Sequence, residues 1–231
     1  ADETNKWTEV ARQMHFPYSK AYEVYLQQDG FLDKELIPAA QLPKSERPIN
    51  QKWSWDRILR SPYIKQADVL QGFYFFENHF DEHTIEKHFD FYEPFTVHES
   101  SLSPCVHAIL ASKLNRHEKA YEMYLRTSRL DLDDYNHEVH EGLHITSMAG
   151  TWLSIVQGFG GMRNFDGKLS FDPKIPKNWK SYSFKIKYRD HTIKVFKNHE
   201  GCKFYNESDS PVNITVSGKE ITIFNQDLVI L

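Results

Sequence analysis

The spacing of apolar residues changes once along the chain, near residue 165. Before that point apolar residues recur every three or four positions, which is the period of an α-helix with one buried face. After it they alternate with polar residues, as in a half-buried β-strand. The pattern predicts a mainly helical part over residues 1–164, followed by a small antiparallel β-sheet domain over residues 165–231.

Five helices are expected in the first part, near residues 7–14, 66–80, 103–114, 117–129 and 145–159. Ser103 and Pro104 form an expected helix start, with Ser103 as the N-cap and Pro104 in the first turn. Because short polar loops join successive helices, the natural architecture is an array of antiparallel helix pairs or a toroid. Residues 29–62 carry few helical signals, so a long loop is expected there, and long loops are often functional.

Two hairpins are expected in the β-domain. Residues 182–188 alternate between apolar and polar side chains, residues 189–191 form a turn, and Ile193 and Val195 continue the return strand. A second pair of strands lies over residues 212–223, with a turn at 217–219. The second part is therefore expected to be an antiparallel sheet.

Composition and charge exclude several classes of partner. The net charge of −4 and the pI near 6.3 argue against binding to nucleic acid or to an anionic membrane. No signal peptide opens the chain, and Cys105 and Cys202 are expected to be free thiols, so the expected location is the cytoplasm. The chain begins without Met, so a fragment or processed product is expected. Its 12 histidines and its 14% content of aromatic residues suit a carbohydrate site.

Residues 140–144 (HEGLH) match the H-E-x-x-H pattern of zinc peptidases. That site needs His140 and His144 one turn apart on a single helix, with Glu141 as the general base. The preceding residues are polar and loop-like, Gly142 weakens a helix, and no acidic ligand follows between 142 and 165. A zinc hydrolase on these residues is therefore kept only as a minor alternative, and no metal is expected.

Two segments led by histidine precede predicted helices, at residues 98–103 (HESSLS) and 144–150 (HITSMAG). Unpaired N–H groups at a helix start and nearby hydroxyls suit an anion such as phosphate. Either segment alone is more simply a helix cap, but the two together favour a shared phosphate. Lys65 and Gln66 add a cation and an amide, which can hold sugar hydroxyls.

These segments carry a resemblance to a known family. Three runs resemble family 65 of the glycoside hydrolases: residues 65–70 (KQADVL), 91–103 (FYEPFTVHESSLS) and 144–152 (HITSMAGTW). Residues 121–127 (YEMYLRT) and 130–134 (LDLDD) are most similar to its members that cleave maltose. The resemblance covers essentially the whole chain.

The resemblance implies a fold, a reaction and a set of site residues. The chain would supply the later helices of an (α/α)6 barrel and a C-terminal β-sheet domain. The implied reaction is inverting phosphorolysis of an α-glucosyl disaccharide, with maltose as the expected substrate, to β-glucose 1-phosphate and glucose. Lys65 and Gln66 would hold the glucosyl unit. The residues implied to bind phosphate are Ser100, Ser101, His144 and Ser147, with Thr146 and Gly150 as further candidates.

An inverting phosphorylase needs one carboxylic acid, because phosphate is itself the anionic nucleophile and has only to be positioned. In the family this acid lies in a motif like Gly-Pro-Asp-Glu-Tyr-His, which this sequence lacks. The acid is therefore expected upstream, in the remainder of the barrel, and the isolated chain is expected to be inactive. No cofactor is implied beyond inorganic phosphate as co-substrate, and the full-length protein is expected to be a homodimer. A non-catalytic fragment or subunit that binds sugar and phosphate stays open as an alternative.

Overall fold

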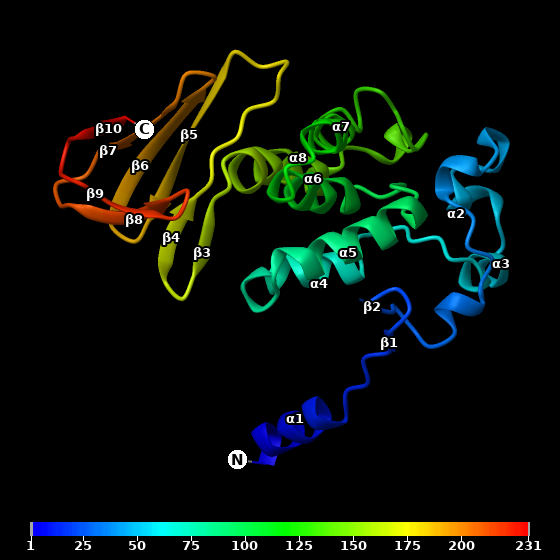
Figure 1. The fold of residues 1–231 in the computed structure, drawn as a ribbon. Helices are drawn as coiled ribbons and strands as arrows, with labels where there is room; N and C mark the ends of the chain where they lie inside the picture. The colour runs from blue at the N-terminus through cyan, green and yellow to red at the C-terminus, as the bar shows by residue number, and fades with distance from the viewer. Residues whose placement is uncertain (1, 231) are drawn as a thin grey trace.

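The computed structural model describes residues 2–230, in which a helical portion is followed by two β-sheets (Figure 1). The main helices are α1 (Asp2–Gln13), α4 (Val69–Phe75), α5 (Glu82–Tyr92), α6 (Ser103–Lys113), α7 (His117–Ser128) and α8 (Ile145–Leu153), which continues as a π-helix (Ser154–Phe159). The expected class, mainly helical with a β-sheet domain after the helices, is confirmed.

Helix α6 is the centre of the helical portion. Its residues from Ser103 to Ser112 are all buried, so the helix is enclosed on every side by other elements. Helices α4, α7 and α8 and the π-helix all contact it. The candidate phosphate segment 98–103 ends at the start of α6, and the segment 144–150 forms the N-cap and first residues of α8, so this packing brings them to the same region.

Helix α5 is not anticipated from the sequence, and α4 is shorter than the expected helix over 66–80. Helix α5 contains many charged and His residues. Its buried positions Ile85, Phe89 and Tyr92 therefore do not stand out as a helical pattern of apolar residues in the sequence. The Asp81 side chain caps the helix by accepting a 2.7 Å hydrogen bond from the Thr84 N–H.

Residues 29–62 are not the structureless loop that the sequence indicates. They contain three 3₁₀ turns and two short helices: Phe31–Asp33, Ala39–Gln41, Lys44–Glu46, α2 (Ile49–Lys52) and α3 (Trp55–Arg60). Before them, β1 (Tyr18–Ser19) and β2 (Val24–Tyr25) form a small hairpin. Ala39 and Ile49 pack with Val97 in a small core of their own, which ties the segment to the start of the 98–103 loop.

The two expected hairpins are confirmed as β5 (Ser181–Tyr188) with β6 (His191–Asn198) and β8 (Val212–Val216) with β9 (Lys219–Ile223). Four further strands complete two four-stranded sheets, in the orders β10-β7-β6-β5 and β3-β4-β8-β9. They are β3 (Arg163–Phe165), β4 (Lys168–Phe171), β7 (Cys202–Asn206) and β10 (Leu228–Ile230). One pairing departs from the antiparallel expectation, because β4 and β8 run parallel. The sheets share one core, in which the Phe171 and Phe204 ring centroids lie 5.2 Å apart.

An aromatic cluster joins the sheet domain to the helices. The Trp179 ring lies edge-on to Tyr124 and Phe159, with ring centroids 5.1 Å apart in each pair. The buried Tyr182 hydroxyl donates to the Phe159 carbonyl at 2.9 Å, and burial raises the pKa of Tyr182. The helical and sheet portions therefore share a packed, partly polar joint.

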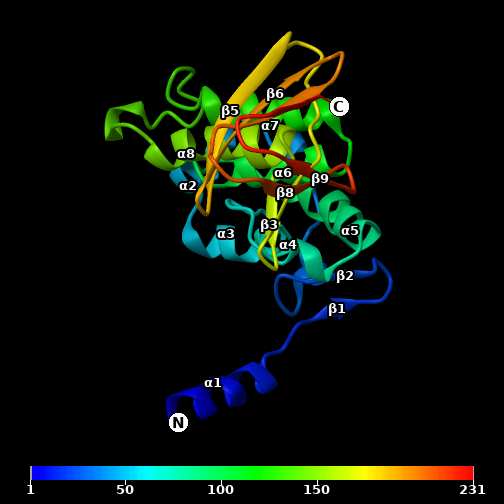
Figure 2. The ribbon, with the colours of Figure 1, turned by 90° about the vertical axis from the view of Figure 1, so that its left-hand side faces the viewer.

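Helix α1 stands apart from the rest of the molecule in both views (Figures 1 and 2). It has no buried residue, and its apolar side chains Trp7 and Val10 are exposed, as is Met14 just after it. Among residues 2–230, no helix combines the length and the apolar character needed to cross a membrane.

We predict that Trp179→Ala weakens the joint between helices and sheets, because it removes a ring that several aromatic neighbours contact. Urea unfolding should show a loss of about 3 kcal/mol in the free energy of unfolding. The control is Trp55→Ala, which removes the same side chain from a site that is 75% exposed. Equal losses in the two variants would contradict the role of Trp179.

Candidate functional site

A short parallel bridge places Lys65 and Gln66, the residues expected to hold sugar, beside the first candidate phosphate segment. Ile64 N–H donates to the Phe95 carbonyl at 3.0 Å, and Val97 N–H donates to the Ile64 carbonyl at 2.9 Å. Lys65 and Gln66 follow Ile64 directly, and both are exposed. They therefore lie next to the 98–103 loop, as the sequence motifs require, although they precede helix α4 and do not begin it.

The 98–103 loop is held by a buried carboxylate. Glu99 is 2% exposed and accepts hydrogen bonds from Arg47 Nε at 2.8 Å and from the Ile49 N–H at 2.7 Å. From the other side, the Arg126 guanidinium donates to the His98 carbonyl at 2.7 Å. His98 has a left-handed backbone with φ of 53°, which is strained for a residue with a Cβ and needs such support.

Two hydroxyls from the separate phosphate segments meet. Ser101 Oγ lies 2.7 Å from Thr146 Oγ1, although the residues are 45 positions apart. Ser100 is buried, and its Oγ accepts from the Leu102 N–H at 3.2 Å. Ser103 does not cap α6, because the cap is Leu102 and Ser103 Oγ instead lies 2.9 Å from His98 Nδ1.

His144 is clamped by Asp131, a residue for which the sequence indicates no role. Its Nδ1–H donates to Asp131 Oδ1 at 2.6 Å and its backbone N–H donates to Asp131 Oδ2 at 3.0 Å. The bond from the His144 backbone, together with the side-chain bond, lowers the pKa of Asp131 against the opposing effect of burial. On the other side of the ring, His144 Nε2 lies 3.8 Å from Glu138 Oε2.

The start of α8 offers fewer free N–H groups than the sequence indicates. The N–H of His144 is bonded to Asp131, that of Ile145 to Leu143 and that of Ser147 to His144. Among the N–H groups of residues 144–148, Thr146 alone has no acceptor in the described residues. An anion here would therefore depend on side chains more than on the helix start.

Ser147 and Gly150 hold α8 in place. The buried Ser147 hydroxyl donates to the Thr127 carbonyl of α7 at 2.6 Å. A Cβ on Gly150 would lie 2.9 Å from Cys105 Cβ and 3.1 Å from Thr127 Cγ2, so glycine is required there for close packing. Both contacts account for these residue types without a ligand, and the phosphate role of Ser147 and Gly150 stays a prediction.

One pocket joins parts of both candidate sites. It has a volume of about 490 Å³ and lies where α4, α6 and α8 meet. The residues at its wall include Gln66, Tyr74, Leu102, Cys105, Thr146, Gly150 and Leu153. Gln66 and Thr146 thus face the same space. A hollow of about 670 Å³ on the β3-β4-β8-β9 sheet contains none of the site residues expected from the sequence.

Residues 140–144 do not form the helix that a zinc peptidase needs. His140 lies in a 3₁₀ turn (Val139–Glu141), whereas His144 is the N-cap residue of α8. Gly142, between them, has a positive φ of 110°, which does not occur within an α-helix. The two imidazoles are therefore not one helical turn apart on one face, and His144 Nδ1 is occupied by Asp131.

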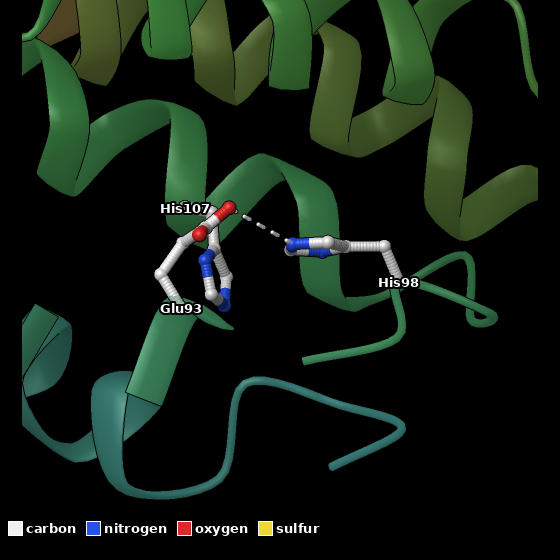
Figure 3. Close-up of side chains that lie close together, drawn as sticks. All are labelled: Glu93, His98 and His107. Carbon is white, nitrogen blue, oxygen red and sulfur yellow. Dashed lines mark ion pairs between the residues drawn. The ribbon is translucent and has the colours of Figure 1, made fainter. Parts of the chain in front are cut away.

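Another group of side chains has the kinds of atoms that bind metal ions. Within the described residues, Glu93, His98 and His107 form one such cluster (Figure 3). Burial lowers the pKa of both histidines, and neither ring nitrogen of His107 has a hydrogen-bond partner in the described residues. However, Lys119 Nζ lies 3.0 Å from Glu93 Oε1, so an ammonium already neutralises the carboxylate that a metal would use. We interpret the cluster as a support for the 98–103 loop.

Comparison with known proteins shows the family of the chain. Residues 1–153 match the glycosyl hydrolase family 65 central catalytic domain, and residues 162–223 match the C-terminal domain of that family. A solved structure from the human microbiome, described under the name kojibiose phosphorylase, superposes with a TM-score of 0.90 at 35% identity, over 98% of this chain and 30% of that one.

Three curated relatives are similar over nearly the whole chain. Maltose phosphorylase of Bacillus subtilis is 49% identical over 96% of the chain, and the α,α-trehalose phosphorylase of Thermoanaerobacter brockii is 38% identical over 96%. Kojibiose phosphorylase of Halothermothrix orenii is 32% identical over 99%. The chain spans 29%, 29% and 30% of the lengths of these relatives.

The fold and the matched domains assign the chain to the glycoside hydrolase families. Among these families, the chain belongs to family 65, and these relatives are disaccharide phosphorylases.

We predict that Gly150→Ala destabilises the protein by about 2 kcal/mol, because the new methyl group collides with Cys105 and Thr127. Gly72→Ala is the matched control, since Gly72 is also helical and nothing lies within 4 Å of the place that a Cβ would take there. That control should gain about 1 kcal/mol from helix propensity. Urea unfolding measures both, and an unchanged stability for Gly150→Ala would remove the packing explanation.

The Glu93 carboxylate gives a pH prediction. Burial opposes its ionisation, but the nearby His98 ring and the Lys119 ammonium at 3.0 Å outweigh burial and lower the pKa of Glu93 from 4.5 to about 2. The stability that this pairing adds is therefore present above pH 4.5 and is lost as the pH falls toward 2.

Urea unfolding between pH 4.5 and 2 should show a loss of up to about 3 kcal/mol that Glu93→Gln lacks, since glutamine does not titrate. Glu220→Gln, at an exposed position in β9, should lose stability as the parent does. A parallel acid loss in Glu93→Gln and the parent would contradict the assignment.

Proposed function

We propose that this chain is the C-terminal part of an inverting phosphorylase that cleaves an α-glucosyl disaccharide, maltose, with inorganic phosphate to β-glucose 1-phosphate and glucose. The observation that carries the proposal is the 2.7 Å contact between Ser101 and Thr146 at a pocket that Gln66 also lines. It unites the sugar-holding and phosphate-binding motifs of the family. The choice of maltose rests on the relative with 49% identity.

Phosphorolysis needs hydrogen-bond donors that hold the phosphate, and it needs no general base. Phosphate is already an anion, so the protein has to hold it behind the anomeric carbon while a separate acid protonates the leaving oxygen. Hydroxyl groups of Ser100, Ser101 and Thr146 can donate to phosphate oxygens, and His144 can donate from Nε2 when its ring is protonated on both nitrogens. Lys65 and Gln66 are proposed to hold the glucosyl hydroxyls.

The general acid is proposed to lie outside this chain, in upstream helices that complete an (α/α)6 barrel with residues 1–164. The exposed apolar side chains Trp7, Val10 and Met14 support this, because such a face gains stability when another helix covers it. Residues 165–231 are proposed to act as the separate C-terminal sheet domain. On this proposal, the chain alone binds but does not cleave.

The setting of the enzyme is also a proposal. The buried, unpaired thiols Cys105 and Cys202 support a reducing compartment such as the cytoplasm. We propose no cofactor besides phosphate, and a homodimer for the full-length protein on the basis of the family resemblance alone.

The reaction is tested by expressing the chain with its upstream coding sequence and supplying maltose with and without phosphate. Glucose 1-phosphate should appear only when phosphate is present, whereas the 231-residue chain alone should produce none. Release of glucose at an equal rate without phosphate would show a hydrolase and overturn the proposal. Trehalose and kojibiose, tested in parallel, decide the substrate.

In the extended protein, Ser101→Ala should raise the KM for phosphate roughly tenfold, because one donor to an anion is lost. The KM for the disaccharide should hardly change. Ser210→Ala, in an exposed turn of the sheet domain, is the control. The opposite pattern, a raised KM for the disaccharide alone, would move Ser101 to the sugar site.

A further inference from the structure

We propose that Asp131 is the positioning residue of the phosphate site, which locks the His144 ring so that Nε2 faces the phosphate. This inference rests on the proposed function, because it assigns a task to a neighbour of the phosphate cradle. Asp131 lies in the turn after α7, 13 residues before His144.

The geometry leaves His144 little choice of orientation. One carboxylate oxygen of Asp131 accepts from the ring Nδ1–H at 2.6 Å, and the other accepts from the backbone N–H of the same residue at 3.0 Å. An ionised carboxylate only accepts hydrogen bonds, so Nδ1 must carry a hydrogen. The ring is thereby tied to its own backbone at the start of α8, and Nε2 is the nitrogen left to meet a ligand.

A carboxylate lies near each ring nitrogen, and it is the hydrogen bond from Nδ1 to Asp131 that leaves Nε2 as the nitrogen open to a ligand. Asp131 is negative on the Nδ1 side and offsets the positive charge that the ring carries when it donates to an anion. Because Nδ1 already carries a hydrogen, Nε2 donates to phosphate only when the ring is protonated on both nitrogens. Glu138 Oε2 lies 3.8 Å from Nε2, beyond hydrogen-bond distance, so it does not occupy that nitrogen. The bonds from His144 lower the pKa of Asp131, so this carboxylate stays charged in neutral solution.

A purely structural role as a helix cap makes a different prediction. Asn caps helix starts about as well as Asp, so Asp131→Asn should keep the start of α8. Its amide has one oxygen and one NH₂ group, so it accepts from only one of the two N–H donors, and the NH₂ group can instead donate to a bare Nδ1. The tautomer of His144 is then no longer fixed. Asp133→Asn is the matched control, because Asp133 lies in the same turn but bonds to Arg129 and not to His144.

Two measurements test the inference. In the 231-residue chain, nitrogen NMR of the His144 ring should show Nδ1 protonated in the parent and in Asp133→Asn, and a mixture of tautomers in Asp131→Asn. In the extended phosphorylase, Asp131→Asn should raise the KM for phosphate roughly tenfold while the KM for the disaccharide stays within about twofold. Asp131→Glu, which keeps the carboxylate, should recover part of the phosphate affinity.

The outcomes separate this inference from the proposed function. If the parent extended protein does not need phosphate, the proposed function fails, while NMR still reports whether Asp131 sets the tautomer. If the parent is a phosphorylase but Asp131→Asn keeps its phosphate KM, the positioning role is overturned. An equal rise in both KM values would show a general structural loss and would overturn it as well. If Asp131→Asn does not fold, the positioning role is tested with Asp131→Glu alone, by the His144 tautomer and by the KM values for phosphate and disaccharide.

Discussion

The buried ion pair of Glu99 is the contact on which the candidate site depends. A carboxylate that is 2% exposed destabilises a fold unless it is paired, and here Arg47 and the Ile49 N–H supply the pairing. The loop that carries Ser100 and Ser101 can therefore take this form only when the segment around Arg47 is folded against it. The region that looks like a loop in the sequence is thus the support of the site.

The sequence predicts the fold best where one period runs uninterrupted. The hairpins β5–β6 and β8–β9 and the helices α6 and α7 are predicted because their apolar positions decide the pattern. Helix α5 is not predicted, because charged residues interrupt its buried face. Strands β3 and β4 are not predicted because they are too short to show alternation of apolar and polar residues. The parallel β4–β8 pair depends on contacts between distant residues, which no local pattern reports.

The candidate site is predictable as segments but not as individual groups. Ser- and Thr-rich helix starts point to residues 98–103 and 144–150, and the Ser101–Thr146 contact shows that these segments meet. The sequence cannot show that the Ser147 hydroxyl is used by the Thr127 carbonyl, because that bond crosses from α8 to α7. The sequence likewise does not indicate the role of Asp131, because its partner His144 lies 13 residues away across an irregular turn.

The two histidines that lead these segments look equivalent in the sequence and differ in the structure. His98 is 7% exposed, its Nδ1 faces Ser103, and burial lowers its pKa, so it remains inside the support of the loop. His144 is partly exposed, and its ring is clamped from one side only. A ligand needs a donor it can reach, so on the proposed function the phosphate contact falls to His144, while His98 supports the loop conformation. Two segments that look alike in the sequence thus place their histidines at different depths, and the proposed tasks follow that difference.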